Sequence, residues 1–363
     1  MEKISIEAAS HFYNVIIGKS LRYQVEELLE ATYKKVLIIT DTQVAPLYLE
    51  DVKQAFSSQV TVDDYVVPAG EASKSMEQYS RLLDACISLQ LDRKSLIIGL
   101  GGGMVGDLAG FVASTYLRGV DFVQMPTTIL AHDSSVGGKV AINHPQGKNL
   151  IGCFYNPVYV IYDSDTLLSL PLSEVRSGFG EVIKHALLSD AEWSDDLFQK
   201  NVSELSPEQL ISYLSKGIQV KADIVEQDEK ENGIRRHLNL GHTLAHALEA
   251  ELGYGEITHG EAVALGIWFS LRVSEQQLGA NLPTEKYVKW LTQNYYPIHL
   301  IKNINKKRVI ERMKWDKKTV ESQIHYVLLE AIGKPAVKTI EESKLDELLT
   351  GFLKEVSHID ERN

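Results

Sequence analysis

The first half of the chain alternates short apolar runs with segments of helical periodicity, and no other feature constrains the fold as strongly. The runs are rich in β-branched residues and cover residues 34–40, 64–68, 95–100, 121–125 and 158–163. Strands separated by helices pair in parallel, because each helix returns the chain across a face of the sheet. We therefore expect a parallel α/β sheet built from βαβ units.

The second half has a different pattern. After PLSEVRSGFGEV the strand-like runs almost vanish, and amphipathic helical patterns dominate as far as IHYVLLEAIG. At 363 residues the chain also exceeds the size at which a single hydrophobic core keeps growing. These features predict an α/β domain over residues 1–171 and a mainly α-helical domain over residues 172–363, with the boundary near Pro171.

A glycine-rich loop stands between an apolar run and a helical segment in LIIGLGGGMVGDLAGF. Gly101, Gly103 and Gly106 have the spacing G-x-G-x-x-G. Such glycines let the backbone approach a dinucleotide pyrophosphate, whose charge is stabilised at the helix N-terminus. A tight strand-to-helix turn without a ligand is the alternative. The loop therefore indicates a Rossmann-like nucleotide site, although a turn without a ligand could have the same glycines.

Other polar residues lie in loops after strands, where open α/β sheets bind their ligands. They include Asp41 in IITDT, Glu71 and Lys74 in PAGEASKS, and the threonines of PTT. Taken singly, each of these residues is more often a helix cap or part of a turn.

The net charge of −12 argues against nucleic-acid binding, which depends on a positive surface. An anionic small ligand must therefore be held by a local group of basic residues. Two segments hold polar and basic groups of this kind, although a charged run is usually a solvated face. The first, residues 132–152, contains Asp133, Lys139, Lys148 and Asn149, and the second, residues 221–242, contains Lys221, Glu231, Arg235, Arg236 and Asn239.

Three histidines lie close together in GHTLAHALEAELGYGEITHGE, residues 241–261. His242 and His246 share one face of a predicted helix, opposite a leucine stripe. A capping box, T-x-x-E at 258–261, places His259 in the first turn of the next helix. A catalytic zinc commonly takes two histidines and one carboxylate, and His242, His246 and Glu249 of one helix are a possible set, although ligands from several elements enclose an ion better. Periodicity leaves the choice of ligands open.

The sequence also predicts the compartment. The N-terminal residues lack the apolar run and cleavage site of a signal peptide. No segment approaches the roughly 20 apolar residues that span a bilayer. Cys86 and Cys153 form neither a disulfide framework nor a thiolate zinc site. We expect a cytoplasmic protein that binds neither membranes nor nucleic acid.

Several segments together resemble the 3-dehydroquinate synthases of the sugar phosphate cyclase superfamily. They are GGGMVGDLAGFVASTYLRG, PTT, DSSVGGK, GKNLIG, GEVIKHA, LNLGHTLAHALE and THGEAVALG. They follow the family's order and cover nearly the whole chain. The resemblance implies a dehydroquinate synthase-like fold, with NAD bound by residues 1–171 and metal and substrate bound by residues 172–363.

The resemblance also implies two cofactors, NAD and one divalent metal, which is zinc or cobalt. Glu181, His242 and His259 would bind the metal, and His246 would contact the substrate phosphate. The residues implied for NAD are Asp41, Glu71, Lys74, Gly102, Gly103, Met104, Asp107, Thr127, Thr128 and Lys148. Those implied for the substrate are Asp133, Lys139, Asn149, Lys184, Lys221, Arg235, Asn239 and His246, with Lys317 or Lys318 at the phosphate and Arg118 from the second subunit of a homodimer.

The implied reaction converts 3-deoxy-D-arabino-heptulosonate 7-phosphate to 3-dehydroquinate and phosphate in the shikimate pathway of aromatic amino acid biosynthesis. Its steps are transient oxidation by NAD at C5, phosphate elimination, re-reduction, ring opening and intramolecular aldol closure, so the enzyme is a carbon–oxygen lyase. Two alternatives share the glycine loop and the histidines: a metal- and NAD-dependent polyol dehydrogenase of the glycerol type, and a related sugar phosphate cyclase.

Overall fold

The computed structural model describes residues 1–253, 255–315 and 324–360. The chain divides into two compact units: Met1–Leu170 with Ser206–Lys230, and Pro171–Leu205 with Glu231–Asn363. This division differs from a single boundary near Pro171, because residues 206–230 return to the first unit. Hydrogen bonds to Glu7 and Ser10 hold this segment in the first unit.

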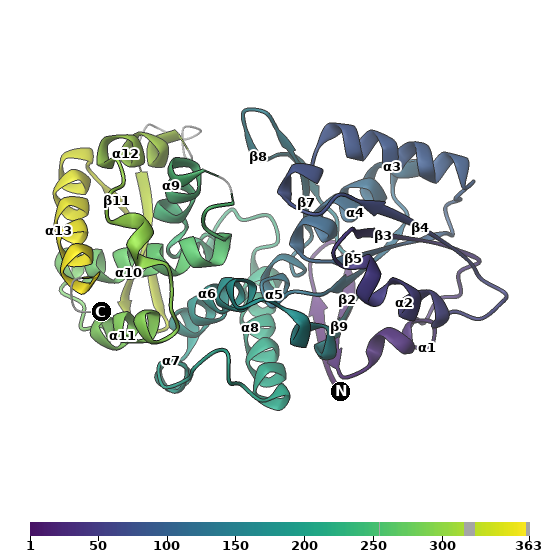
Figure 1. The fold of residues 1–363 in the computed structure, drawn as a ribbon, viewed down its shortest axis with the longest axis horizontal. Coiled ribbons are helices and arrows are strands. Elements are labelled where there is room, and N and C mark those ends of the chain that lie inside the picture. Colours follow the sequence, from purple (N-terminus) through teal and green to yellow (C-terminus); the bar gives the residue numbers. More distant parts are fainter. Residues whose placement is uncertain (254, 316–323, 361–363) are drawn as a thin grey trace. The chain divides into compact units, whose positions relative to one another are not determined.

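The first unit is built on a seven-stranded sheet with the order β1-β2-β9-β6-β5-β3-β4 (Figure 1). Neighbouring strands are parallel, except that β1 and β2 form an antiparallel hairpin at one edge. The strands are β1 (Glu2–Glu7), β2 (Phe12–Gly18), β3 (Lys35–Asp41), β4 (Thr61–Val67), β5 (Leu96–Gly101), β6 (Asp121–Pro126) and β9 (Tyr159–Asp163). The five strands expected from the apolar runs are confirmed, whereas those runs do not predict β1 and β2.

Alternate residues of β3 enter two separate hydrophobic cores. Leu37 and Ile39 pack with α3 (Met76–Ser88) and α4 (Gly103–Thr115), whereas Val36 and Ile38 pack with α1 (Val25–Leu28) and α2 (Glu50–Gln54) on the opposite face. This separation follows from the two-residue period of a strand. The helices of this unit are α1 (Val25–Leu28), α2 (Glu50–Gln54), α3 (Met76–Ser88), α4 (Gly103–Thr115), α5 (Ala131–Ser134) and α8 (Pro207–Gln227), and a separate hairpin comprises β7 (Lys139–His144) and β8 (Gly147–Phe154).

Helix α8 begins at a capping box on Ser206 and is held against the β1–β2 hairpin. The backbone N–H of Glu7 donates to Glu226 Oε1 at 2.9 Å, and that of Ser10 donates to Glu229 Oε2 at 3.1 Å. Carboxylates near the end of α8 thus satisfy backbone donors about 220 residues earlier in the chain. These bonds explain why α8 belongs to the first unit.

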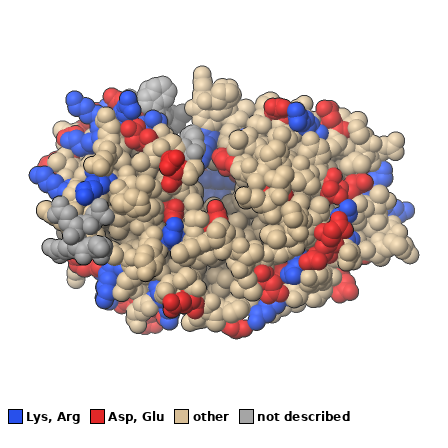
Figure 2. Space-filling view, in the orientation of Figure 1, with Lys and Arg blue, Asp and Glu red and all other residues tan. Residues whose placement is uncertain are grey.

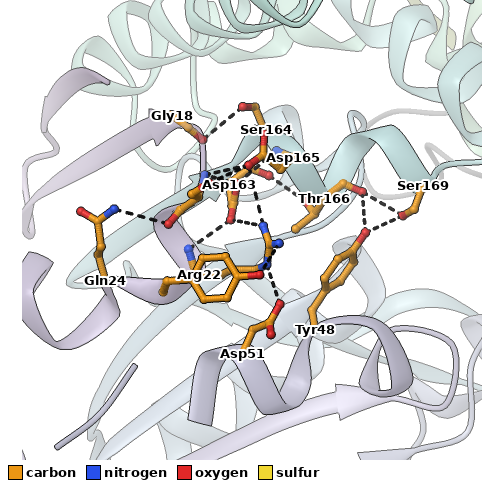
Figure 3. Close-up of polar contacts among 12 residues, drawn as sticks. Gly18, Arg22, Gln24, Tyr48, Asp51, Asp163, Ser164, Asp165, Thr166 and Ser169 are labelled. Atoms are coloured by element: carbon orange, nitrogen blue, oxygen red, sulfur yellow. Dashed lines mark hydrogen bonds and ion pairs between the residues drawn. The ribbon is translucent and has the colours of Figure 1, made fainter. Parts of the chain in front are cut away.

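The carboxyl end of β9 is fixed by Asp163, which Figure 3 shows at the centre of a hydrogen-bond network. Asp163 Oδ1 accepts the backbone N–H groups of Ser20 and Asp165, each at 3.0 Å. Its Oδ2 accepts from the backbone N–H and Nη1 of Arg22 at 3.1 and 2.8 Å. Arg22 Nε also donates to Asp51 Oδ2 at 2.8 Å. The buried carboxylate is fully paired and joins β9 to the loop after β2 and to α2.

The second unit is mainly helical, with α10 as its buried core. Trp268 and Phe269 of α10 pack edge-on against Phe352 of α13. The described elements are α6 (Leu172–Ser189), α7 (Ala191–Leu197), α9 (His242–Leu252), α10 (His259–Leu278), α11 (Thr284–Gln293), α12 (Lys306–Trp315), α13 (Glu342–Asp360) and a hairpin of β10 (Ile324–Ala331) and β11 (Lys334–Ile340). Across the described residues, we find no helix with the length and apolar character needed to cross a membrane.

Candidate active site

The glycine loop joins β5 to α4, as the spacing predicts. Gly102 is the N-cap residue of α4, and a Cβ there would lie 3.1 Å from Thr128 Cγ2. A Cβ on Gly103 would lie 2.9 Å from Ser134 Oγ. Within the described residues, the buried hydroxyls of Thr128 and Ser134 have no hydrogen-bond partner. Unpaired buried hydroxyls beside a helix N-terminus fit a polar anionic ligand such as a pyrophosphate.

Lys74 draws together three other predicted site residues in the first unit. Its buried ammonium lies 2.6 Å from Asp107 Oδ2 and 3.8 Å from Glu71 Oε1, and it donates to Asn149 Oδ1. Burial raises the pKa of Asp107, and the Lys74 ammonium opposes that rise. Residues expected to contact NAD and one expected to contact the substrate therefore form a single cluster.

Asn143 also belongs to this cluster, and sequence reasoning missed it. The residue stands in β7 and bonds to Glu71, Lys74 and Asn149. Its side chain lies beside two of the predicted segments only because the chain folds back at the β7–β8 hairpin. The polar turn INHPQGKN is the sequence signal for such a residue.

The remaining residues predicted for NAD lie at strand ends or beside the loop. Asp41 Oδ1 accepts the N–H groups of Gln43 and Val44 at 2.8 and 3.0 Å, so it caps the turn after β3. The Thr127 N–H donates to the carbonyl of Gly101 at 3.0 Å. Met104 lies in the first turn of α4, and Lys148 lies in β8; both are partly buried.

Lys221 and Asp133 form a second polar pair in the first unit. Lys221 Nζ lies 3.2 Å from Asp133 Oδ2 and also donates to the Asp133 carbonyl. The ammonium comes from α8 and the carboxylate from α5, so the tethering of α8 places this pair. Lys139 is exposed at the start of β7, and Arg118 is exposed after α4.

In the second unit, Glu181 lies between two histidines. Its Oε1 is 3.5 Å from His242 Nε2 and 3.5 Å from His259 Nε2. One ligand atom from each of these three residues lies within 4.8 Å of the others. A carboxylate and two imidazoles are the ligand types of a catalytic zinc with an open position. The donors come from three helices, α6, α9 and α10.

Close glycine contacts bring these three helices together. A Cβ on Gly180 would overlap the carbonyl of Gly260, and one on Gly260 would overlap the carbonyl of Ser177. Likewise, a Cβ on Gly266 would overlap the carbonyl of Gly241. Each donor adjoins such a glycine: Glu181 follows Gly180, His242 follows Gly241, and His259 precedes Gly260. The backbones therefore approach closely at the donors themselves.

In both His242 and His259, the ring nitrogen that does not face Glu181, Nδ1, has a hydrogen-bond acceptor. His259 Nδ1 lies 2.9 Å from Glu249 Oε2, and His242 Nδ1 lies 3.2 Å from the Leu240 carbonyl. Such contacts hold the rings with Nε2 toward Glu181, as outer-shell partners do for metal ligands. Sequence reasoning considered Glu249 as a ligand, but the structure places its carboxylate behind His259.

The two histidines have opposite electrostatic surroundings. Burial lowers the pKa of His242 to about 3, and Glu181 only partly opposes this. Burial also acts to lower the pKa of His259, but its hydrogen bonds to Glu181 and Glu249 outweigh burial and raise the pKa to about 10. Two carboxylates around His259 stabilise positive charge, which fits a site for a cation.

His246 lies beside this cluster, but it does not belong to the possible ligand group that contains Glu181. Its ring centroid is 5.5 Å from that of His242 and 5.8 Å from that of His259. A second possible ligand group contains His246, Glu249 and His259. Using Glu249 as a ligand would compete with its bond to His259 Nδ1, so the geometry favours the group around Glu181.

The other residues predicted for the substrate in this unit lie near Glu181 or in the segment before α9. Lys184 forms a buried ion pair with Glu181 one helical turn away. Arg235 is 1% exposed, and Asn239 Nδ2 donates to Glu231 Oε1 at 2.8 Å. Lys317 and Lys318 lie outside the described residues.

The distribution of charge fits a protein that binds an anion through a few nearby basic residues. Figure 2 shows acidic and basic side chains interspersed over the face in view. Four basic residues predicted for the site are instead buried: Lys74 and Lys221 in the first unit, and Lys184 and Arg235 in the second. Buried cations with polar partners act on a ligand at close range, where solvent screens them less.

Comparisons with known proteins point to the same family in both halves of the chain. The family models for the 3-dehydroquinate synthase N-terminal and C-terminal regions match residues 64–177 and 178–319. The 3-dehydroquinate synthase of Oceanobacillus iheyensis is 48% identical over 359 residues, covering 99% of this chain and 100% of the relative.

Among solved structures, 2-deoxy-scyllo-inosose synthase complexed with carbaglucose-6-phosphate, NAD+ and Co2+ has a TM-score of 0.87 at 25% identity, covering 96% of this chain and 99% of that chain. The glycerol dehydrogenase of Schizosaccharomyces pombe has a TM-score of 0.68 at 16% identity, covering 96% of this chain and 90% of that chain. The second likeness concerns the fold alone.

Proposed function

The chain belongs to the 3-dehydroquinate synthase family, and on that premise we propose that it converts 3-deoxy-D-arabino-heptulosonate 7-phosphate to 3-dehydroquinate and phosphate. The observation that carries this proposal is the grouping of Glu181, His242 and His259 in a chain 48% identical to a named synthase. Net release of phosphate from carbon makes the enzyme a carbon–oxygen lyase.

The proposal includes one NAD and one divalent metal, zinc or cobalt. We assign NAD to the glycine loop and the Lys74 cluster, and the metal to Glu181, His242 and His259. When bound, NAD would accept a hydride from C5 and later return it, while the metal would polarise the substrate hydroxyls as a Lewis acid. The structural neighbour with NAD+ and Co2+ supports this pair of cofactors.

The side chains of this protein would then bind and orient the substrate. Lys139, Lys221 and Arg235 supply positive charge for a substrate that carries both a carboxylate and a phosphate. Asn149 and Asn239 offer hydrogen bonds, and His246 contacts the phosphate. Holding the reacting groups in place contributes several kcal/mol to catalysis, because orientation entropy is lost before the chemical step.

Turnover distinguishes this reaction from the polyol dehydrogenase alternative. With the heptulosonate phosphate and a small amount of NAD, released phosphate should exceed the NAD supplied many times over, because each cycle regenerates the cofactor. NADH absorbance should show no lasting rise. Phosphate assays and absorbance at the NADH band measure both quantities, and glycerol serves as the control substrate. Stoichiometric NADH from glycerol without phosphate release would contradict the synthase proposal.

We further propose a homodimer in which Arg118 acts in the partner's site. Leu117 and Arg118 both have positive φ, 50° and 69°, which is uncommon for these residue types. Leu117 and Phe154 are 40% and 42% exposed, and β8 lies beside this turn because the Tyr155 hydroxyl donates to the Val120 carbonyl at 2.8 Å. An exposed apolar surface around an arginine suits an isologous contact with a second copy.

Subunit mixing tests the role of Arg118. Arg118→Ala and Lys221→Ala should each be nearly inactive alone. If Arg118 acts across the interface, a mixed dimer contains one site with both defects and one with neither. Random exchange should therefore restore roughly a quarter of all sites. Mass spectrometry verifies the exchange. Exchange without recovered activity would mean that Arg118 does not act in its partner's site.

We also propose a cytoplasmic location. Cys86 and Cys153 are both free thiols. A reducing compartment maintains thiols in this state.

A further inference from the structure

Asn143 lies between residues assigned to NAD and a residue assigned to the substrate. Its Nδ2 donates to Glu71 Oε1 at 2.7 Å, and its Oδ1 accepts the backbone N–H of Asn149 at 2.9 Å. Its own backbone N–H donates to the Lys74 carbonyl at 2.7 Å. One residue therefore connects the segment after β4, the strand β7 and the strand β8.

A β-bulge gives Asn143 this role. Ile142 pairs with Ile151, but His144 pairs with Gly147, so residues 148–150 stand opposite Asn143 alone. The irregular pairing leaves the Asn143 N–H available to the Lys74 carbonyl. Asn149 within the bulge has a φ of 57°, a left-handed conformation that asparagine tolerates well. Bulges of this kind re-aim side chains beside active sites.

The partners determine the orientation of the Asn143 amide. The Glu71 carboxylate only accepts hydrogen bonds, and the Asn149 backbone N–H only donates. Nδ2 must therefore face Glu71 while Oδ1 faces Asn149. Because the amide group is planar, both bonds are made from one side-chain conformation. Rotation that breaks one bond also breaks the other.

Lys74 completes the connection on the same residues. Its ammonium donates to the side chain of Asn149 and pairs with Asp107 at 2.6 Å. The backbone N–H of Asn149 thus bonds to Asn143, and its side chain bonds to Lys74, which is assigned to NAD. Lys74 contacts Asn149 directly, and Glu71 is connected to Asn149 through Asn143.

We propose that Asn143 is a positioning residue that couples the binding of NAD to the binding of the sugar phosphate. This inference rests on the proposed function, in which Glu71 binds NAD and Asn149 binds the substrate. A ligand that orders Glu71 also orders the Asn143 amide and Asn149, so the second ligand meets a site whose ordering entropy is already lost. By linkage, each ligand tightens the binding of the other by the same factor.

Calorimetry with a non-reacting ligand measures this coupling. The probe is a 5-deoxy analogue of the heptulosonate phosphate, which has no C5 hydroxyl for NAD to oxidise. In the wild-type protein, saturating analogue should lower the Kd of NAD by roughly tenfold. In Asn143→Ala, NAD alone should bind more weakly, and the ratio of the two Kd values should approach one.

Asn156→Ala is the matched control. Asn156 lies in the same unit, and its Nδ2 donates to Glu229 Oε1 at 2.8 Å and to Ser10 Oγ at 3.2 Å. Its removal breaks a similar number of side-chain hydrogen bonds away from Glu71 and Asn149. The Kd of NAD and the coupling ratio should remain those of the wild-type protein. Loss of coupling in Asn156→Ala as well would overturn the assignment to Asn143.

If Asn143→Ala does not fold, Asn143→Asp provides a second test. Asn143→Asp has the same shape and retains an acceptor for the Asn149 N–H, but it sets a carboxylate against Glu71. NAD binding should weaken by about tenfold or more, with a smaller effect on the analogue. Wild-type NAD affinity in Asn143→Asp, or wild-type coupling in Asn143→Ala, would refute the proposal. A wild-type protein that binds no NAD or releases no phosphate would refute the proposed function instead.

Discussion

Purified His242→Ala and His259→Ala should each contain almost no zinc, whereas His246→Ala should retain zinc and lose turnover. The Nε2 atoms of His242 and His259 both lie 3.5 Å from Glu181 Oε1, so in the proposed site each supplies one of the three protein donors. Removing one donor leaves too few ligands for a tetrahedral ion with one open position. Elemental analysis of the dialysed proteins measures the zinc content.

Glu249→Gln should reduce zinc affinity less than His242→Ala and His259→Ala do. Its carboxylate accepts from His259 Nδ1 at 2.9 Å, and loss of an outer-shell carboxylate typically reduces metal affinity by about 10–100-fold. Zinc affinity should therefore decrease from wild type to Glu249→Gln and decrease further in His259→Ala. Zinc lost from His246→Ala but kept in His259→Ala would show that the ligand assignment is wrong.

Gly260→Ala should abolish zinc binding and activity without removing any polar group. The new Cβ would overlap the Ser177 carbonyl, which belongs to the backbone of α6 and is not free to rotate away. Helix α10 must then shift relative to α6, and His259 shifts relative to Glu181. Metal–ligand distances tolerate changes of only about 0.2 Å, and a misplacement of about 1 Å can reduce catalysis about 10²-fold. Zinc content and the rate of phosphate release measure the effect.

Gly351→Ala is the matched control for this substitution. Gly351 lies in α13 of the same unit, and nothing lies within 4 Å of the position that a Cβ would take. Alanine in an open helical position should raise stability by about 0.5–1 kcal/mol and leave zinc bound. Circular dichroism shows whether Gly260→Ala has folded. A folded Gly260→Ala protein with wild-type zinc affinity would mean that the glycine contact does not position the donors.

Local patterns in the sequence were sufficient for much of the fold. The apolar runs predicted β3, β5, β6 and β9, because strand residues buried on both faces form short apolar segments that can be read directly. The run at 64–68 also predicted the edge strand β4, although most of that strand is not buried. The capping box at Thr258 and Glu261 predicted the start of α10, and the structure confirms it. Both signals involve residues only a few positions apart.

Other elements escaped because their signals are weak or distant. β1 lies at a sheet edge, is largely exposed and carries few apolar residues. β2 is buried, and its short apolar run at 15–17 was a usable strand signal that sequence reasoning missed. The return of α8 to the first unit depends on the bonds of Glu226 to Glu7 at the end of β1 and of Glu229 to Ser10 just after it. No periodicity within α8 contains that information, because its partners lie about 220 residues away.

The sequence by itself determined the residue types available for the site and the helices that carry them. Helical spacing could not choose between His242 and His246, since both lie on one helical face, and only the family resemblance implied His242. The tertiary structure groups Glu181 with His242 and His259, and it places Glu249 behind His259. Helical spacing relates neighbours within one turn, whereas a metal site depends on side chains from separate helices. Those helices meet where Gly180, Gly241, Gly260 and Gly266 let their backbones touch, and that contact forms only in the folded chain.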